Sequence, residues 1–128
     1  MATDHLPHEL VYQRALMLAA PQHLPVRVYQ RNIINAQTVH GGRVRNGIKG
    51  QADLEVIVLG TALHVEVEAK TESGRLSPEQ RKWQAFCQRS NIPHLVVRVR
   101  PNETVSETVT RWIQELRTCI ENHAPRRL

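Results

Sequence analysis

The chain has 128 residues, of which 41% are hydrophobic and 23% charged, a composition typical of a globular protein. This length is enough for one domain with a buried core, so residues 1–128 are expected to form a single domain. The formal net charge of +5 favours a polyanionic partner. No apolar run is long enough for a membrane span, and the first residues do not resemble a signal peptide.

Two cysteines, Cys87 and Cys119, lie among apolar residues of predicted helices. They are expected to be buried free thiols, as in a protein of the reducing cytoplasm, rather than a disulfide framework. The seven histidines show no Cys/His spacing typical of a zinc site. No P-loop or dinucleotide fingerprint is present either.

The first predicted helix covers residues 7–20, because Pro7 suits a first helical position and Pro21 is expected to end it. Its expected buried stripe consists of Leu10, Val11, Ala15 and Leu18. Alternation over residues 26–31 predicts a strand, and an irregular stretch follows as far as the turn at Gly41-Gly42.

Residues 43–50 form a glycine-punctuated basic segment directly before an acidic strand. It contains Arg43, Arg45 and Lys49, which could contact phosphate groups. A solvated loop is the competing interpretation of these three cations.

A β-hairpin is predicted over residues 50–70, with a two-residue type II′ turn at Gly60-Thr61. This turn would place Asp53 opposite Glu68 and Glu55 opposite Glu66, so all four carboxylates share one face with Lys70 beside them. Opposed like charges destabilise a sheet. A divalent cation would explain the cluster, because hard cations bind carboxylate oxygens. The alternative is an ordinary solvated strand face.

Ser77, Pro78 and Gln80 predict the start of a helix with a capping box. Its buried side is expected to contain Trp83, Phe86 and Cys87. A strand follows over residues 94–100. The last helix, residues 104–122, has a capping box of Thr104 and Glu107 and an apolar stripe of Val105, Val109, Trp112, Leu116 and Ile120. A strand–helix–strand passage predicts a mixed sheet with helices packed on it.

The ordered set Gly50-x-x-Asp53, Glu68-Ala69-Lys70 and Gly74-Arg75-Leu76-Ser77-Pro78-Glu79-Gln80 resembles the VRR-NUC branch of the PD-(D/E)XK nucleases. The resemblance continues through Val96-Val97-Arg98-Val99-Arg100 and covers roughly residues 25–100. Ala52 stands where the superfamily name has proline. The fold implied is a restriction-endonuclease-like α/β core, with a mixed central sheet of about four strands flanked by helices.

The resemblance implies that Asp53 and Glu68 hold Mg²⁺ or Mn²⁺ and that Lys70 positions or activates water. The backbone carbonyl of Ala69 is a plausible third ligand. Gln80 would contribute to the site, although capping alone explains it. Glu9, in the first turn of the first helix, could complete the metal site, or it could simply complement the helix dipole.

The expected function is metal-dependent hydrolysis of DNA phosphodiester bonds, with branched or Holliday-junction-like DNA as substrate in replication, recombination or repair. A homodimer is implied by resemblance to small stand-alone members. Candidates for phosphate contacts are Arg31, Arg43, Arg45, Lys49 and Arg75. The alternatives are a non-cleaving DNA-binding module on the same fold, a nuclease acting on RNA, and a structural or antitoxin-like protein with an acidic patch.

Overall fold

The computed structural model describes residues 9–31, 36–37, 43–44 and 49–123. The elements are α1 (Glu9–His23), β1 (Val26–Gln30), β2 (Ala36–Gln37), β3 (Arg43–Val44), β4 (Leu54–Val58), β5 (His64–Lys70), α2 (Pro78–Arg89), β6 (His94–Arg98) and α3 (Val105–His123). The short antiparallel pair β2–β3 was not predicted from the sequence. None of the described helices is long and apolar enough to cross a membrane.

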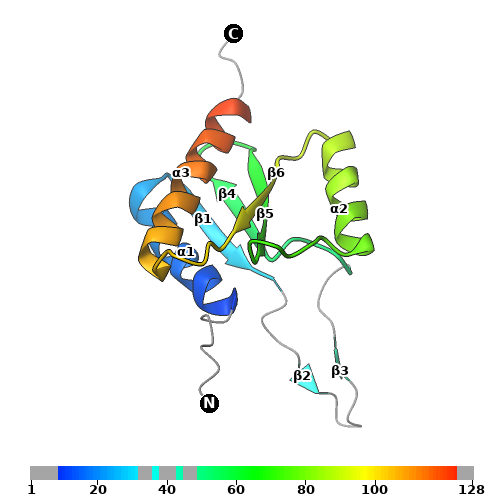
Figure 1. Ribbon diagram of the computed structural model, residues 1–128. Helices are drawn as coiled ribbons and strands as arrows, with labels where there is room; N and C mark the ends of the chain where they lie inside the picture. The colour runs from blue at the N-terminus through cyan, green and yellow to red at the C-terminus, as the bar shows by residue number, and fades with distance from the viewer. Residues whose placement is uncertain (1–8, 32–35, 38–42, 45–48, 124–128) are drawn as a thin grey trace, which may run out of the picture.

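One four-stranded mixed sheet, in the order β1-β4-β5-β6, forms the centre of the molecule. Its neighbouring strands are antiparallel except for β5 and β6, which run parallel on either side of α2 in the chain. Helices α1 and α3 cover one face of the sheet and α2 lies on the other (Figure 1). The predicted α/β architecture with a mixed sheet and flanking helices is therefore confirmed.

The hydrophobic core lies between the sheet and the α1–α3 layer. Val28, Val56, Val67 and Val97, one from each strand, are buried there together with Trp112 of α3. Because strand side chains alternate between faces, this burial leaves the intervening polar residues of β4 and β5 on the α2 side.

The hairpin of β4 and β5 has the predicted register, with Glu55 paired to Glu66 and Ile57 paired to His64. The predicted two-residue turn is wrong, because the Val58 amide donates to the Leu63 carbonyl and leaves a four-residue loop. Thr61 N donates to Val58 O at 3.3 Å, and Gly60 has φ 75°. Gly60 thus holds the third position of a β-turn, where a type II turn requires positive φ.

Helix α1 differs from the sequence prediction in its end and in its buried face. It runs through Pro21 to His23, because Leu24 N still donates to Ala20 O and closes the last turn beyond the proline. Of the expected stripe, Leu18 is 69% exposed. The buried face consists of Tyr12, Gln13, Leu16 and Ala20. The segment from Ala15 to Ala20 is apolar on every side, so periodicity alone could not select the face.

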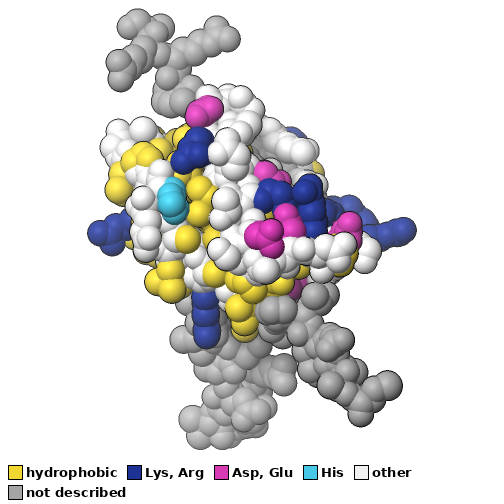
Figure 2. Space-filling model, turned by 60° about the vertical axis from the view of Figure 1, so that its left-hand side comes forward, with side chains coloured by type: hydrophobic (Ala, Val, Ile, Leu, Met, Phe, Trp, Pro, Cys, Tyr) yellow, Lys and Arg dark blue, Asp and Glu magenta, His cyan; other side chains and the backbone are white. Residues whose placement is uncertain are grey.

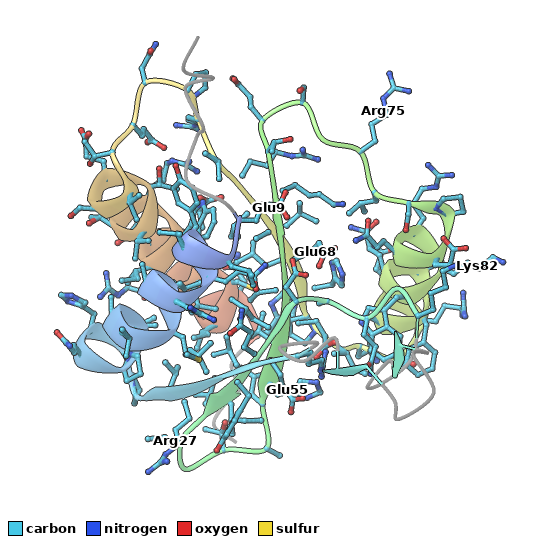
Figure 3. The ribbon with its side chains drawn as sticks, turned by 90° about the horizontal axis from the view of Figure 1, so that it is seen from below. Glu9, Arg27, Glu55, Glu68, Arg75 and Lys82 are labelled. Atoms are coloured by element: carbon cyan, nitrogen blue, oxygen red, sulfur yellow. The ribbon has the colours of Figure 1, made fainter. Side chains whose placement is uncertain are left out.

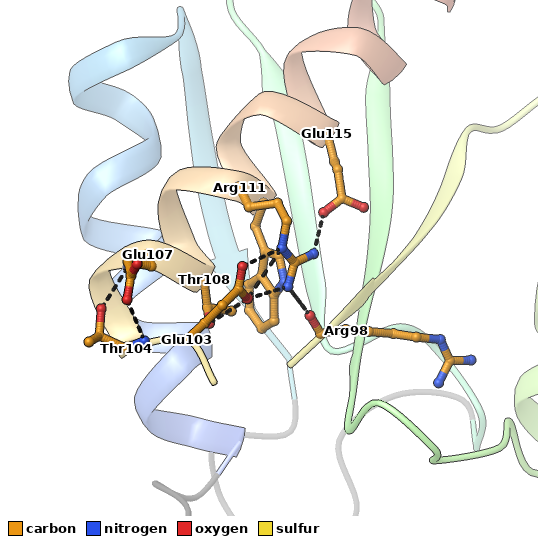
Figure 4. Close-up of polar contacts among 8 residues, drawn as sticks. Arg98, Glu103, Thr104, Glu107, Thr108, Arg111 and Glu115 are labelled. Carbon is orange, nitrogen blue, oxygen red and sulfur yellow. Dashed lines mark hydrogen bonds and ion pairs between the residues drawn. The ribbon is translucent and has the colours of Figure 1, made fainter. Parts of the chain in front are cut away.

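Both predicted capping boxes are present. Ser77 accepts from Gln80 N while the Gln80 side chain accepts from Ser77 N. Thr104 and Glu107 make the equivalent pair at the start of α3. Figure 4 shows this box beside the Arg111 side chain, which bonds Glu103, Glu115 and the Arg98 carbonyl at the end of β6. These contacts fix the start of α3 against the sheet.

Candidate active site

Asp53 and Glu68 lie beside each other on the α2 face of the sheet, as the register predicted. The Asp53 amide donates to Glu68 Oε2 at 3.0 Å, and the Ala69 amide donates to Asp53 Oδ2 at 2.9 Å. Each acid therefore contacts the strand that carries the other. Glu68 is only 2% exposed, whereas Asp53 is partly exposed, so the pair is open on the Asp53 side.

The position of Asp53 follows from the end of the β4 ladder. Leu54 is the first residue of β4, so at Asp53 the side-chain carboxylate, rather than a backbone carbonyl, accepts the Ala69 amide. In a strand the N–H and C=O of one residue point to the same side. The Ala69 carbonyl therefore faces the same side as Asp53, which is the placement that a third oxygen ligand needs.

Burial is the main cause that raises the pKa of Glu68, to about 8, and the charge of nearby Asp53 raises it further. The positive charge of Lys70 lowers the same pKa. A buried carboxylate crowded by a second one, as Glu68 is by Asp53, favours binding either a proton or a cation.

Gln80 joins α2 to this pair, and both predicted roles are present in one side chain. Its Oε1 accepts from Ser77 N at 2.8 Å, which completes the capping box, and its Nε2 donates to Glu68 Oε1. The cap thus fixes the amide in the orientation that bonds Glu68.

The second carboxylate pair, Glu55 and Glu66, is bridged by Arg31. The guanidinium donates to Glu55 Oε2 and to both oxygens of Glu66. Arg31 follows β1, and its amide donates to Asp53 O at 2.8 Å, which brings the side chain to this face. Sequence reasoning assigned Arg31 to nucleic-acid contact, but its charge is used within the protein.

Glu66 is also a buried acceptor for two further side chains. Trp83 Nε1 of α2 donates to its Oε1 at 2.9 Å, and His64 Nε2 lies 3.2 Å from its Oε2. His64 is half-buried against Glu66. Glu66 therefore anchors α2 to the sheet, and only Asp53 and Glu68 of the four acids have no cation bonded to them among the described residues.

Glu9 lies at the start of α1, on the opposite layer from α2 (Figure 3). Among the described residues, no three His, Cys, Asp or Glu side chains gather closely enough to hold a metal ion. Glu9 is thus not joined to Asp53 and Glu68 in such a group, and its role in the site stays a prediction.

The remaining basic candidates are only partly described. Arg75 is exposed and points away from the body of the molecule (Figure 3), and Lys49 lies 3.4 Å from Glu79 in an exposed ion pair. Arg45 and the Arg43 side chain lie outside the described residues. On the face turned forward in Figure 2, basic side chains occupy several separate places, with acidic ones among those on the right.

Two residues that shape the surroundings of the site were not predicted from the sequence as site residues. Arg98, the sheet neighbour of Lys70, donates to the carbonyls of Thr71 and Gly74 and shapes the loop after β5. Gly50 has φ 92°, and a Cβ there would lie 2.4 Å from Glu79 O. The alternation of residues 94–100 could have indicated Arg98, whereas the Gly50 contact depends on where α2 packs.

Comparison with known proteins gives one match. The family model of the VRR-NUC domain matches residues 44–101. This segment contains Gly50, both candidate metal ligands, Lys70 and Gln80. No curated protein and no solved structure matches the chain. The mixed sheet with its three helices is consistent with a restriction-endonuclease-like fold. Residues 44–101 therefore match the VRR-NUC domain, which belongs to the PD-(D/E)XK nuclease-like superfamily.

Proposed function

We propose that this nuclease domain is a metal-dependent endonuclease that hydrolyses phosphodiester bonds of branched or otherwise structured DNA in replication, recombination or repair. The observation that carries the proposal is the pairing of Asp53 with Glu68, each bonded to the other's strand, with the charge of Lys70 acting on Glu68. These are the three side chains that the family resemblance assigns to the site, and the contact between Asp53 and Glu68 supports that assignment.

The residues present suit Mg²⁺ or Mn²⁺. Two carboxylates and the Ala69 carbonyl offer the oxygen donors that hard cations prefer. Their mutual repulsion, which contributes to the raised pKa of Glu68, is the cost that a cation would relieve. When bound, such an ion would polarise the phosphate and lower the pKa of a water ligand.

The other side chains near the site would have separate roles in the reaction. Lys70, at the end of β5, would stabilise the negative charge that develops on the phosphate oxygens during attack by water. Gln80 is a positioning residue, because it holds Glu68 through its Nε2 and acts on the substrate only through that carboxylate. Lys49 and Arg75 remain exposed for contacts with the DNA backbone.

The test is cleavage of a synthetic four-way junction, a flap and a plain duplex with Mg²⁺ or Mn²⁺, and in EDTA. We expect cleavage only with the metal, and we expect Lys70→Ala and Asp53→Asn to abolish it while DNA binding persists. Glu55→Gln is the matched control, because it removes a carboxylate from the same face that is bonded to Arg31. Undiminished cleavage by both site variants would refute the assignment.

The same experiment separates the alternatives. A shift of branched DNA in a gel without cleavage in any divalent metal would identify a non-cleaving binding module. Preferential cleavage of an RNA of the same structure would show that RNA, rather than DNA, is the substrate. We also propose a homodimer, since one chain offers one Asp53–Glu68 site and symmetric cutting of two strands needs two copies. The mass in solution tests this.

A further inference from the structure

A groove on the outer side of α2 exposes an aromatic pair. It has a volume of about 370 Å³ and is lined by Lys49, Glu79, Lys82, Trp83 and Phe86. The rings of Trp83 and Phe86 are 5.3 Å apart with an interplanar angle of 31°. Phe86, which the sequence predicted to be buried, is 43% exposed. An exposed aromatic ring braced by a second ring requires an explanation that core packing does not give.

The pair is held in a fixed orientation. Trp83 Nε1 donates to buried Glu66 at 2.9 Å, so the indole cannot rotate away without breaking that bond. Phe86 lies one helical turn further along and rests on this anchored ring. A flat apolar surface that is already ordered loses little side-chain entropy when another flat ring stacks on it.

The groove adjoins the candidate active site along the same helix. Gln80, which bonds Glu68, precedes Trp83 by three residues, or about 4.5 Å of helix rise. A strand whose phosphate lies at the Asp53–Glu68 pair could therefore place a neighbouring nucleotide over α2.

Lysines at the rim of the groove could contact the phosphates of such a nucleotide. Lys82 is exposed at the edge of α2 (Figure 3), and the Lys49 side chain is 61% exposed. Lys49 pairs with Glu79, but an exposed pair of this kind contributes little and can exchange for a phosphate. Aromatic faces for bases and lysines for phosphates are the combination found where single strands bind.

We propose that this groove binds an unpaired nucleobase of the DNA strand that is held at the active site, by stacking it on Phe86 and Trp83. The inference rests on the proposed function and adds to it, because it identifies unpaired bases as the feature that the domain recognises in its substrate.

The test measures binding in EDTA, where cleavage does not interfere. The probes are a fluorescein-labelled 12-nucleotide oligothymidylate and a blunt duplex of equal length, followed by fluorescence anisotropy. Stacking on an aromatic side chain predicts that Phe86→Ala weakens oligothymidylate binding by roughly tenfold or more. Duplex binding should change by less than about twofold, because paired bases offer no free face. Phe86→Trp should preserve binding.

Leu18 of α1 and Arg27 of β1 offer matched controls away from the groove. Leu18→Ala removes an apolar side chain of α1 that is 69% exposed and should leave both affinities unchanged. Lys82→Ala should lower the slope of log affinity against log salt by roughly 0.7 for the single strand. Arg27→Ala removes an exposed cation at the opposite edge of the molecule (Figure 3) and should not change that slope.

The proposal is overturned if the wild-type protein does not bind oligothymidylate, or if Phe86→Ala weakens both probes equally or neither. A failure of the nuclease assignment appears differently, as cleavage that survives Lys70→Ala and Asp53→Asn. Because the binding assay contains no divalent metal, the two failures are distinguishable.

Discussion

At the scale of single residues, the two carboxylate pairs on one face of the sheet have different bonding partners. Glu55 and Glu66 share the guanidinium of Arg31, whereas Asp53 and Glu68 accept from amide donors and have no ion pair with a cation among the described residues. Within the Asp53–Glu68 pair, burial and the charge of Asp53 raise the pKa of Glu68. The raised pKa of Glu68 thus lies in the pair that the family resemblance assigns to the metal site, and a buried group with a perturbed pKa is a candidate for function.

The first prediction concerns pH in the metal-free protein. The pKa of Glu68 is about 8 in the folded state, against roughly 4.3 when unfolded, so the native state binds this proton more tightly. The stability that Glu68 contributes is present at low pH and is lost as pH rises through this interval. We expect the free energy of unfolding of the wild type, minus that of Glu68→Gln, to fall from pH 5 to pH 8. Urea unfolding in EDTA measures both values. A difference that is constant across this range would contradict it.

The second prediction separates the two roles of Gln80. Ser77→Ala removes the helix cap and should cost about 1 kcal/mol of stability while leaving the bond to Glu68 and most of the activity. Gln80→Glu keeps an oxygen for the Ser77 amide but places a carboxylate against Glu68. It should therefore abolish cleavage with a smaller loss of stability. Thermal melting and junction cleavage of both variants check this, and equal effects on activity would contradict it.

At the scale of elements, α2 determines the site as much as the strands do. It bonds Glu68 through Gln80 and Glu66 through Trp83, and its first turn packs on Gly50. Because β5 and β6 are parallel, a crossover must connect them, and α2 is that crossover. The helix that the topology demands therefore also covers the acidic face.

The third prediction uses two glycines with positive φ. A Cβ at Gly50 would collide with Glu79 O, whereas a Cβ at Gly60 meets nothing within 4 Å. Gly60→Ala should cost about 1 kcal/mol from the left-handed backbone alone. Gly50→Ala should cost more, roughly 2 kcal/mol or above, because the collision adds to the same strain. It should also lower cleavage by displacing α2. Urea unfolding of both variants measures the difference, and equal costs would refute the contact.

At the scale of the whole molecule, the sheet has an acidic face toward α2 and an apolar face toward α1 and α3. The valine faces of the strands are buried under α1 and α3, and the acidic faces of β4 and β5 lie toward α2. A cation at the Asp53–Glu68 pair would bind only the folded chain, since the pair exists only when β4 and β5 are joined.

The fourth prediction follows from that linkage. A divalent ion at tenfold its dissociation constant should stabilise the folded chain by about 1.4 kcal/mol. Mg²⁺ or Mn²⁺ should therefore raise the melting temperature of the wild-type protein and of Glu55→Gln, but not that of Asp53→Asn. Differential scanning fluorimetry with and without EDTA measures this. An equal rise in Asp53→Asn would show that the ion binds elsewhere.

The sequence by itself determined the local features of this protein. The predicted hairpin register, with Glu55 paired to Glu66, is present even though the connecting turn is a four-residue loop, and Ser77 and Thr104 correctly predicted the helix starts. These features depend on neighbours in the chain. The tertiary structure alone decided which acids bond to Arg31, which face of α1 is buried and that Phe86 is exposed. Each of these depends on where distant elements pack: Arg31 reaches Glu66 only because β1 joins β4, and no local pattern encodes that contact.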